Sequence, residues 1–350
     1  MTTFHHALRR RFVFRSLAAW LAAGSMATAA MPVALAQEGS AAAASRTPTG
    51  KVPAAVSVLS IVEHPSLDAL RDGLHDELKD AGYQDGKSLH WAYQSAQGNQ
   101  GTAVQIARKF VGDRPDVIVP IATPAAQAVV SATHQIPVVY NAITDPIAAQ
   151  IVKSMAPSGT NVTGVSDKLV ADRQVAFIKR VVPDVKRVGI IYSPAEANSV
   201  SATREMKVAL EKQGISLVEV AAPRSIDVGQ AAQRLVGKVD VIYTSNDNNV
   251  ISAYESVIKV ANAAKIPLIC ADRSSVQRGA TGAMAIDYYR MGRQTGRMVL
   301  RILNGEKPGD IASETSDRLD ITLNLDAARR QGATLSPELK AEASEIFGNP

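Results

Sequence analysis

The chain of 350 residues is longer than one hydrophobic core usually supports, so two domains are expected. Its 46% hydrophobic and 20% charged residues are typical of a globular protein. The formal charge of +5 comes largely from four arginines within residues 1–36. Removing these four from the 38 basic residues leaves 34 against 33 acidic ones, which excludes a general electrostatic attraction to nucleic acid.

Residues 1–36 have the pattern of a cleavable secretory signal. A basic start with Arg9–Arg11 precedes an apolar stretch from Leu17 to Ala30 and a small-residue cleavage site at Ala34–Ala36. The arginines also fit a twin-arginine signal, so the export route stays open. Cys270 is the only cysteine and lies far from this segment, so neither a disulfide nor a lipid anchor is expected. We therefore expect a periplasmic protein.

Strands and helices alternate after a tether rich in small residues over 37–51. The first strand is predicted over 54–61 and the first helix over 65–81, where leucines recur every three or four residues and form one apolar stripe. Further strands are predicted over 88–96, 116–123 and 136–143, with helices between them. This alternation predicts an α/β fold with parallel sheets covered on both faces.

The second half of the chain repeats the order of the first. The segment "QIARKFVGDRPDVIVPIATPAA" is echoed by "QAAQRLVGKVDVIYTSNDNN", and "HQIPVVYNAITDP" by "AKIPLICADRSSV". The matched strands lie about 124 to 132 residues apart, which indicates two similarly folded lobes. The alternative interpretation is that the echoed segments reflect only the similarity that all strand–helix–strand units share.

Polar loops follow the predicted strands, and ligands of open parallel sheets bind at the carboxyl ends of strands. Three loops place a polar residue before proline, a pattern typical of helix starts. These pairs are His64–Pro65, Thr123–Pro124 and Asp145–Pro146. In the second half, Asn198 or Ser199 and Asp247 or Asn248 are the predicted helix caps.

These loops could hold a zwitterion. Free amides at helix starts bind carboxylates, and an ammonium group could be neutralised by one of the loop acids. The candidates are Asp145, Asp247, Glu63, Glu196 and Asp272. Each polar residue could equally be a plain helix cap or a solvated loop acid.

An enzyme is the alternative from a different class. The sequence contains no G-x-G-x-x-G, P-loop, H-E-x-x-H or G-x-S-x-G motif. His64 has no second histidine or cysteine at metal-ligand spacing, so neither a metal nor a cofactor is expected. An exported hydrolase using His64 and an acid stays open, because spacing alone does not decide it.

An ordered set of motifs resembles the tryptophan/tyrosine-type substrate-binding proteins of bacterial ABC transporters. The motifs are "SIVEHPSLDALRDGL", "ATPAAQAVV", "AITDPI", "NVTGVSD", "SPAEANS", "VGKVDVIY" with "DNNV", and "DYYRMGRQTG". The resemblance covers residues 52–330. It implies a type I periplasmic-binding-protein fold, in which two Rossmann-like lobes are joined by three crossings and close on a ligand.

The crossings are expected near 161–167, 283–289 and 311–318. The implied division is a signal peptide over 1–36, a tether over 37–51, an N-terminal lobe and a C-terminal lobe. The N-terminal lobe would comprise 52–165 with 286–312, and the C-terminal lobe 166–285 with 313–350. A helix over 288–303, stopped by Gly305, would return to the first lobe.

The resemblance also implies a binding site for an aromatic L-amino acid. The matching positions are His64, Pro65, Thr123, Asp145, Ser193, Glu196, Ala197, Asn198, Ser199 and Asp247. Asp145 or Asp247 would pair with the ammonium group, and Thr123, Asn198 and Ser199 would hold the carboxylate. The sequence departs from the family pattern in two places. It lacks the cysteine that anchors many relatives to lipid, and one ligand loop reads "TSNDNNV". The second departure leaves the identity of the ligand's side chain undecided.

The function implied is that of a monomeric receptor that delivers an amino-acid-like solute to membrane permease subunits of an ABC importer. Hinged closure would capture the ligand without turnover. A receptor that hands its ligand-bound state to a membrane sensor would use the same fold, so that alternative stays open.

Overall fold

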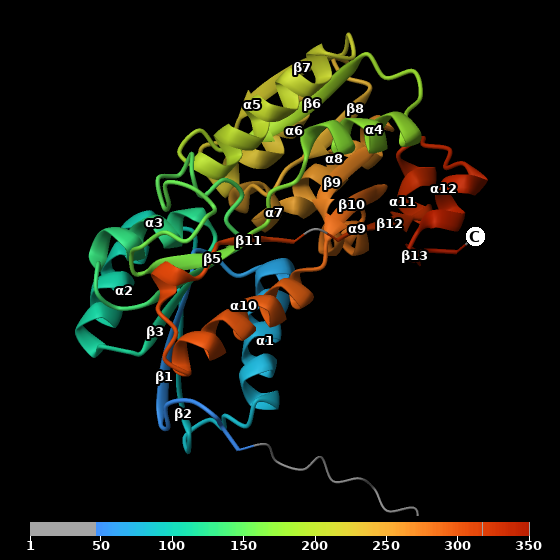
Figure 1. The fold of residues 1–350 in the computed structure, drawn as a ribbon. Helices are drawn as coiled ribbons and strands as arrows, with labels where there is room; N and C mark the ends of the chain where they lie inside the picture. The colour runs from blue at the N-terminus through green and yellow to red at the C-terminus, as the bar shows by residue number, and fades with distance from the viewer. Residues whose placement is uncertain (1–46, 317, 350) are drawn as a thin grey trace, which may run out of the picture. The chain divides into compact units, whose positions relative to one another are not determined.

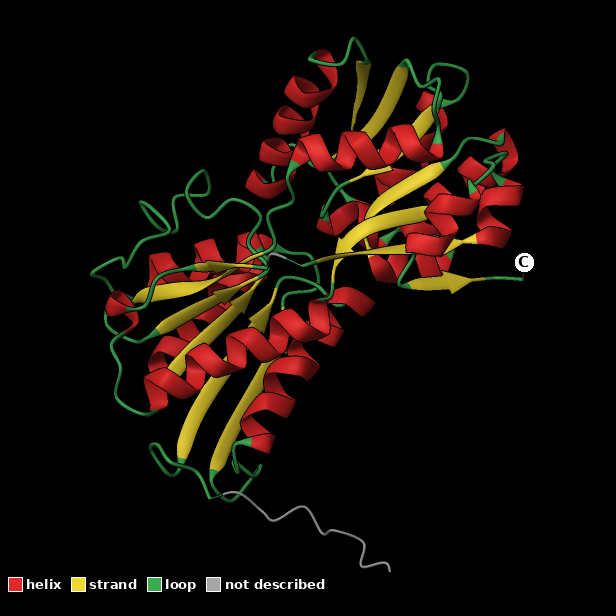
Figure 2. Ribbon diagram, turned by 45° about the vertical axis from the view of Figure 1, so that its right-hand side comes forward, coloured by secondary structure: helices red, strands yellow, loops and turns green. Residues whose placement is uncertain are grey.

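The computed structural model describes residues 47–316 and 318–349, so the predicted signal peptide lies outside the described residues. These residues form two sheets, each flanked by helices (Figures 1 and 2). No described helix is long and apolar enough to cross a bilayer. The α/β prediction with two lobes is confirmed.

The first sheet has six parallel strands. In spatial order they are β11 (Glu314–Thr315), β5 (Val162–Ser166), β4 (Val138–Asn141), β3 (Val117–Ile121), β1 (Ala54–Ser60) and β2 (Leu89–Ser95). The helices of this lobe are α1 (Pro65–Asp80), α2 (Gln100–Asp113), α3 (Thr123–Ala132) and α10 (Tyr288–Leu303). Strands β3, β4 and β5 are buried along their whole length, as expected for a sheet covered on both faces.

The second sheet has seven strands, of which β12 runs antiparallel to β10. Their order is β13 (Glu345–Phe347), β12 (Leu319–Asn324), β10 (Gly282–Ile286), β9 (Leu268–Asp272), β8 (Val241–Thr244), β6 (Arg187–Tyr192) and β7 (Ser216–Ala221). The larger helices of this lobe are α4 (Ala171–Val181), α5 (Ala197–Glu211), α6 (Val228–Leu235) and α8 (Tyr254–Ala264). The shorter ones are α7 (Asn248–Ser252), α9 (Arg273–Arg278), α11 (Leu325–Arg330) and α12 (Pro337–Glu342), with 3₁₀ turns at Ser225–Asp227 and Pro308–Asp310.

The repeat seen in the sequence is a repeat of topology. The strand order β5-β4-β3-β1-β2 of the first sheet recurs as β10-β9-β8-β6-β7 in the second. The chain leaves the first sheet after β5, returns after β10 and leaves again between β11 and β12. The three expected crossings are therefore present.

Two details differ from the expected division of the chain. Strand β11 pairs with β5, so residues 314–315 belong to the first sheet, beyond the predicted limit of 312. Lys51, placed in the predicted tether, donates its backbone amide to the carbonyl of Leu303 at 2.9 Å. The last residue of the tether is therefore held against the end of α10.

Helix α10 returns to the first lobe and packs directly on α1, as Figure 1 shows. Glycines permit this approach. A Cβ atom at Gly292 would lie 2.0 Å from the carbonyl oxygen of Leu70, and one at Gly73 would lie 2.1 Å from that of Tyr289. Only glycine fits at these two positions, so backbone contact between the helices fixes where α1 begins at the carboxyl end of β1.

Candidate functional site

All ten predicted site residues lie just beyond the carboxyl ends of strands. His64 and Pro65 follow β1, Thr123 follows β3, Asp145 follows β4, Ser193 and Glu196 to Ser199 follow β6, and Asp247 follows β8. The side chains of these residues differ in what they contact. Some are fully hydrogen-bonded within the protein, and others keep a buried polar atom without a partner.

His64 caps α1, as predicted, and Pro65 occupies the first helical position. The Leu67 amide donates to Nδ1 of His64 at 3.4 Å, so the ring proton belongs on Nε2. Burial lowers the pKa of His64 to about 4, which keeps the ring neutral at physiological pH. Nε2 is buried and has no partner among the described residues. It is therefore a donor available at the carboxyl end of β1.

Thr123 was predicted to cap α3, and this is wrong. The helix starts at Thr123 itself, its cap position is Ala122, and no side chain caps it. The amides of a first helical turn lack intrahelical partners, and the Thr123 hydroxyl is also buried without a partner. Ala122 has φ of 72° and ψ of 155°, a strained conformation for a residue with a Cβ atom. Strain and unpaired donors thus coincide at the end of β3.

Sequence reasoning missed Asn141, the last residue of β4. Its side chain is completely buried, and neither amide atom has a partner in the described part of the chain. Buried polar groups almost always have partners. A polar residue closing the apolar run "VVYN" was the available signal. Adjacent strands β1, β3 and β4 therefore all end at unpaired polar groups.

Asp145 lies in the loop after β4 and connects the lobes. It caps a turn through the Ala148 amide at 2.9 Å, but no helix follows, contrary to the sequence pattern. Its other oxygen accepts from Ser201 of α5 at 3.1 Å and from Lys168 at 3.4 Å. Burial opposes ionisation of Asp145, yet the Ala148 amide and Lys168 together hold its pKa below the ordinary value. Its charge is thus already compensated by protein groups.

Asp247 caps α7, as predicted, and is fully buried. One oxygen accepts from the Ser193 hydroxyl and the Val250 amide, each at 2.9 Å. The other accepts from the Ser193 amide and the Ser199 hydroxyl, each at 2.6 Å. These four donors fill the carboxylate's acceptor positions. The contacts favour a role in holding the β6 and β8 loops together over contact with an ammonium group.

Asn198 and Ser199 do not cap α5, contrary to the sequence prediction. The helix begins at Ala197, its cap position is Glu196, and no side-chain cap bond forms. Asn198 donates to Glu196 at 3.1 Å and to the Asn246 carbonyl at 2.9 Å, while its Oδ1 is buried without a partner. Asn198 thus joins two loops and keeps one acceptor free.

Glu196 is nearly buried, with 6% of its surface exposed. All three of its donors reach the same oxygen, Oε2: the side-chain amides of Asn198 at 3.1 Å and Asn248 at 2.7 Å, and the Asn248 backbone amide at 3.4 Å. Burial, and then the neighbouring charge of Asp247, raise the pKa of Glu196 to about 7. Oε1 has no donor among the described residues.

Asp167 joins both lobes where the first crossing begins. It accepts from Thr144 at 2.9 Å, from Asn246 at 2.9 Å and from Tyr288 at 2.7 Å. Thr144 belongs to the first lobe, Asn246 to the second, and Tyr288 starts α10 after the second crossing. Sequence reasoning missed this buried carboxylate, although it closes the motif "NVTGVSD" at a predicted crossing.

Asp272, at the end of β9, makes another contact between the lobes. Its Oδ1 accepts from Ser66 of α1 at 2.8 Å, from Ser274 at 2.6 Å and from the Ser275 amide at 2.9 Å. The N-terminus of α1 carries positive partial charge, which compensates a carboxylate. Asp272 therefore closes the lobes against each other.

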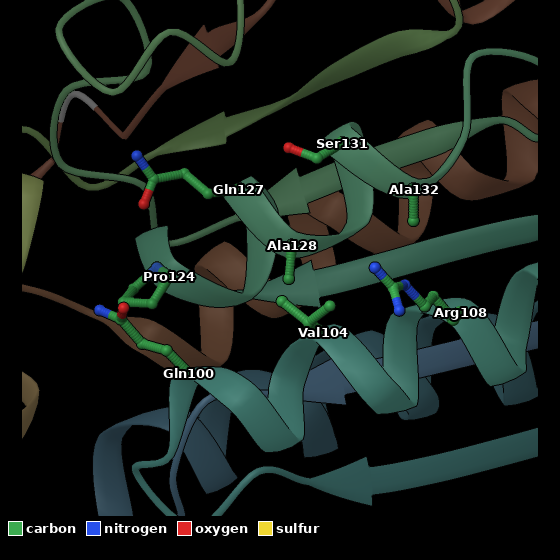
Figure 3. A pocket seen from close by; sticks show the side chains of 8 residues that line it. All are labelled: Gln100, Val104, Arg108, Pro124, Gln127, Ala128, Ser131 and Ala132. Atoms are coloured by element: carbon green, nitrogen blue, oxygen red, sulfur yellow. The ribbon is translucent and has the colours of Figure 1, made fainter.

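A separate surface pocket of about 270 Å³ lies between α2 and α3 (Figure 3). Val104 points toward Ala128 across it, Gln100 and Pro124 lie at one end, and Arg108 and Ala132 lie at the other. It contains no acid and none of the ten predicted site residues. Among the described residues, no cluster of three potential metal ligands exists. The strand-end loops are thus the best candidate site.

Comparisons with known proteins identify the family of the chain. A family model described as ABC transporter substrate binding protein matches residues 55–347. A tyrosine-binding protein of Clostridioides difficile (strain R20291) is 39% identical over 274 residues, which is 78% of this chain and 79% of that protein.

Two solved structures are similar over nearly their whole length. The ABC domain from Streptococcus pneumonia in complex with L-Trp is 34% identical, with a TM-score of 0.81, over 84% of this chain and 99% of that one. The ligand-free, open structure of a substrate-binding protein with adhesive properties from Clostridium difficile is 36% identical, with a TM-score of 0.65, over 85% of this chain and 100% of that one. A glucose-galactose binding protein from Geobacillus stearothermophilus, 17% identical with a TM-score of 0.57, over 77% of this chain and 96% of that one, shares the fold alone.

Proposed function

The chain belongs to the ABC transporter substrate-binding protein family, and we propose that it is the receptor of an importer that captures an aromatic L-amino acid between its two lobes. The family is one of binding proteins rather than enzymes. The observation that carries the proposal is the set of unpaired buried polar atoms at strand ends on both lobes. These atoms belong to His64, Thr123, Asn141, Asn198, Ser245 and Asn246.

The first lobe suits the carboxylate of an amino acid. His64 offers Nε2–H, Thr123 offers its hydroxyl, and the uncapped start of α3 offers backbone amides and the positive end of the helix dipole. Neutral donors of this kind stabilise a carboxylate without adding a charge that would repel the ligand's ammonium. The ammonium group would face the second lobe, where the buried acids lie.

Closure of the lobes on the ligand is supported by two observations. The lobes are joined by hydrogen bonds from Ser66 to Asp272 and from Ser201 to Asp145. The TM-score is higher against the L-Trp complex than against the ligand-free, open structure, although the two relatives are similarly identical to this chain. The described arrangement is thus the one that would enclose a ligand.

The names of the relatives support an aromatic side chain, because one is a tyrosine-binding protein and another is a complex with L-Trp. Delivery to permease subunits, action as a monomer and export to the periplasm by the predicted signal over 1–36 belong to the same proposal. In this proposal, each lobe consists of one of the two sheets and the helices that flank it.

A thermal-shift screen of residues 37–350 against L-tryptophan, L-tyrosine, L-phenylalanine, other amino acids, nucleosides and sugars tests the proposal. A ligand at about 100 times its Kd adds roughly 2.7 kcal/mol to the stability of the folded state and raises Tm by several degrees. We expect a shift with at least one aromatic amino acid, which is recovered unchanged. A shift with a sugar alone would overturn the ligand class, and consumption of the ligand would overturn the binding role.

A further inference from the structure

Glu196 has one oxygen saturated with donors and one without any. Asn198 and Asn248 supply all the donors, and all of them reach Oε2. Oε1 has no donor in the described residues, and it is not one of the side-chain atoms closed off from solvent. The side chain is therefore anchored by one oxygen and presents the other to a partner outside the protein.

Glu196 also forms no ion pair with a lysine or arginine of the described residues. The charge that acts on it most strongly is that of Asp247, which is another buried acid. Asp145 is paired with Lys168, Asp272 faces Ser66 at the start of α1, and Asp247 has four donors of its own. Buried charges need a partner. Of these four carboxyl groups, Glu196 is the one that the protein leaves uncompensated.

We propose that Glu196 binds the ligand's ammonium group on Oε1, and that capture of the ligand expels a proton from this carboxyl group. The proposal rests on the proposed function, since it needs a ligand with an ammonium group. It selects Glu196 from the five loop acids that the sequence offers for the ammonium group, in place of Asp145 or Asp247, which the family resemblance implies. The ligand's positive charge enters where the proton leaves, so the buried cluster keeps its net charge.

The protonation follows from the surroundings. Burial and the adjacent Asp247 favour the neutral form of Glu196 and raise its pKa to about 7. Burial raises the pKa of Asp247 as well, but the four donors on Asp247 oppose this and favour its charged form, so we place the pair's proton on Glu196. An ammonium ion beside Oε1 reverses this preference and makes Glu196 ionise.

Apart from Asp247, whose pKa is also raised by burial, few titratable groups lie near Glu196. The α7 side contributes Asp247 and the neutral Asn248. From the first lobe, Gln100 donates to the Ala195 carbonyl at 3.3 Å, and α3 contains no titratable residue. Glu205, further along α5, is paired with Lys168. His64, with its pKa near 4, is already neutral. Proton release near neutral pH therefore reports on the pair of Glu196 and Asp247, and the Glu196→Gln variant assigns it to Glu196.

Titration calorimetry with L-tryptophan and L-tyrosine tests this directly. Repeating each titration from pH 5.5 to 8.5, in buffers of different ionisation enthalpy, counts the protons released. We expect nearly one proton released per ligand at pH 6 and nearly none at pH 8.5. Affinity should fall about tenfold for each pH unit below about 7.

Two variants of the same helix sharpen the test. Glu196→Gln should abolish proton release, make affinity independent of pH and weaken binding roughly thirtyfold or more at pH 8. Glu211→Gln removes the same charge from an exposed position of α5 and should change neither property. Indole-3-propionate, which lacks the ammonium group, should bind the wild type and Glu196→Gln equally, without releasing a proton.

The outcomes separate the two proposals. If L-tryptophan or L-tyrosine binds the wild type without proton release, or binds Glu196→Gln as tightly as the wild type, the assignment of Glu196 is wrong and the amino-acid receptor stands. If no aromatic amino acid binds the wild type, the proposed function is wrong and this assignment falls with it. Proton counting uses the wild type, so it does not depend on the folding of a variant.

Discussion

The unpaired groups at the strand ends of the first sheet are neutral, whereas the strands of the second sheet end beside three buried carboxyl groups. The acids that follow β4 and β5 in the first sheet, Asp145 and Asp167, already accept from protein donors. At the first edge, His64, Thr123 and Asn141 keep unpaired buried atoms. At the second edge lie Glu196, Asp247 and Asp272. The lobes share one topology but differ in the groups that they leave without a protein partner, and a zwitterion with its carboxylate at the first edge and its ammonium at the second would match that difference.

The edges also differ in how they are built. Backbone contact between α1 and α10, permitted by Gly73 and Gly292, positions the start of α1 at the first edge. Hydrogen bonds to a single carboxylate, Asp247, hold the loops of the second edge. Helix packing thus positions the first edge, and a network of hydrogen bonds positions the second. The variants below separate these two mechanisms.

The largest effect is expected from Asp247→Ala. It leaves the donors of Ser193, Ser199 and Val250 buried without their acceptor, so the free energy of unfolding should fall by about 3 to 5 kcal/mol. Urea unfolding of the ligand-free protein measures this. Asp227→Ala, which breaks a surface pair with Arg224, should cause no measurable change. Equal effects of the two variants would refute the role of Asp247 in the second edge.

Next in size is the effect of Glu196 on stability. Its pKa is raised in the folded protein from 4.5 to about 7, so the folded state binds the proton more tightly than the unfolded state. The contribution of this proton binding to the free energy of unfolding is fully present below pH 4.5 and is lost as pH rises through 7. Ligand-free Glu196→Gln should therefore be roughly 2 to 3 kcal/mol more stable than the wild type at pH 8, and similar to it at pH 4.5. Urea unfolding at both pH values measures this difference, and equal stabilities at pH 8 would contradict it.

Gly292→Ala tests the packing that sets the first edge. The added methyl group would overlap the Leu70 carbonyl, so we expect a loss of about 1 to 3 kcal/mol in unfolding free energy, together with weaker ligand binding. Gly112→Ala adds the same methyl group to α2, where it meets no neighbour. That control should be neutral or slightly stabilising. A Gly292→Ala protein as stable as the control would show that α1 and α10 do not need backbone contact.

The smallest effect on stability is expected from Thr123→Val. It replaces an unpaired buried hydroxyl by a methyl group, so stability should stay the same or rise by up to about 1 kcal/mol, while affinity for the amino acid falls about tenfold. Thr281→Val should show the opposite pattern, because the Thr281 hydroxyl donates to Gln331 at 2.7 Å within the core. Thermal unfolding and calorimetry of both variants measure the contrast. A loss of stability in Thr123→Val with unchanged affinity would contradict a ligand-facing hydroxyl.

The fold was predictable because its signals are local. Leucines from Leu67 to Leu78 mark one face of α1, and the repeated Ile-Pro strand openings mark the two sheets. The strands that end at the site could be placed for the same reason. Parallel strands align their carboxyl ends at one edge, so residues that follow strands meet there.

The roles within the site were not predictable, because they depend on contacts between distant segments. Asp145 looks like a free loop acid until Ser201, 56 residues away, donates to it. Asp247 looks like a charge available to a ligand until four donors, from the segments after β6 and β8, fill its acceptor positions. The roles of Asp167 and Ser66 depend on Asn246 and Asp272, which lie on the second lobe and far away in the sequence. Sequence order thus placed the candidate residues at the strand ends but did not reveal which acid stays unpaired.

The most direct test is a crystal structure of the protein with bound L-tryptophan at a resolution that distinguishes its ammonium from its carboxylate. The account predicts the ammonium nitrogen within hydrogen-bond distance of Glu196 Oε1. It predicts the carboxylate beside the Thr123 hydroxyl and His64 Nε2, at the start of α3. A ligand bound in the reverse orientation, or bound away from the strand ends, would contradict it.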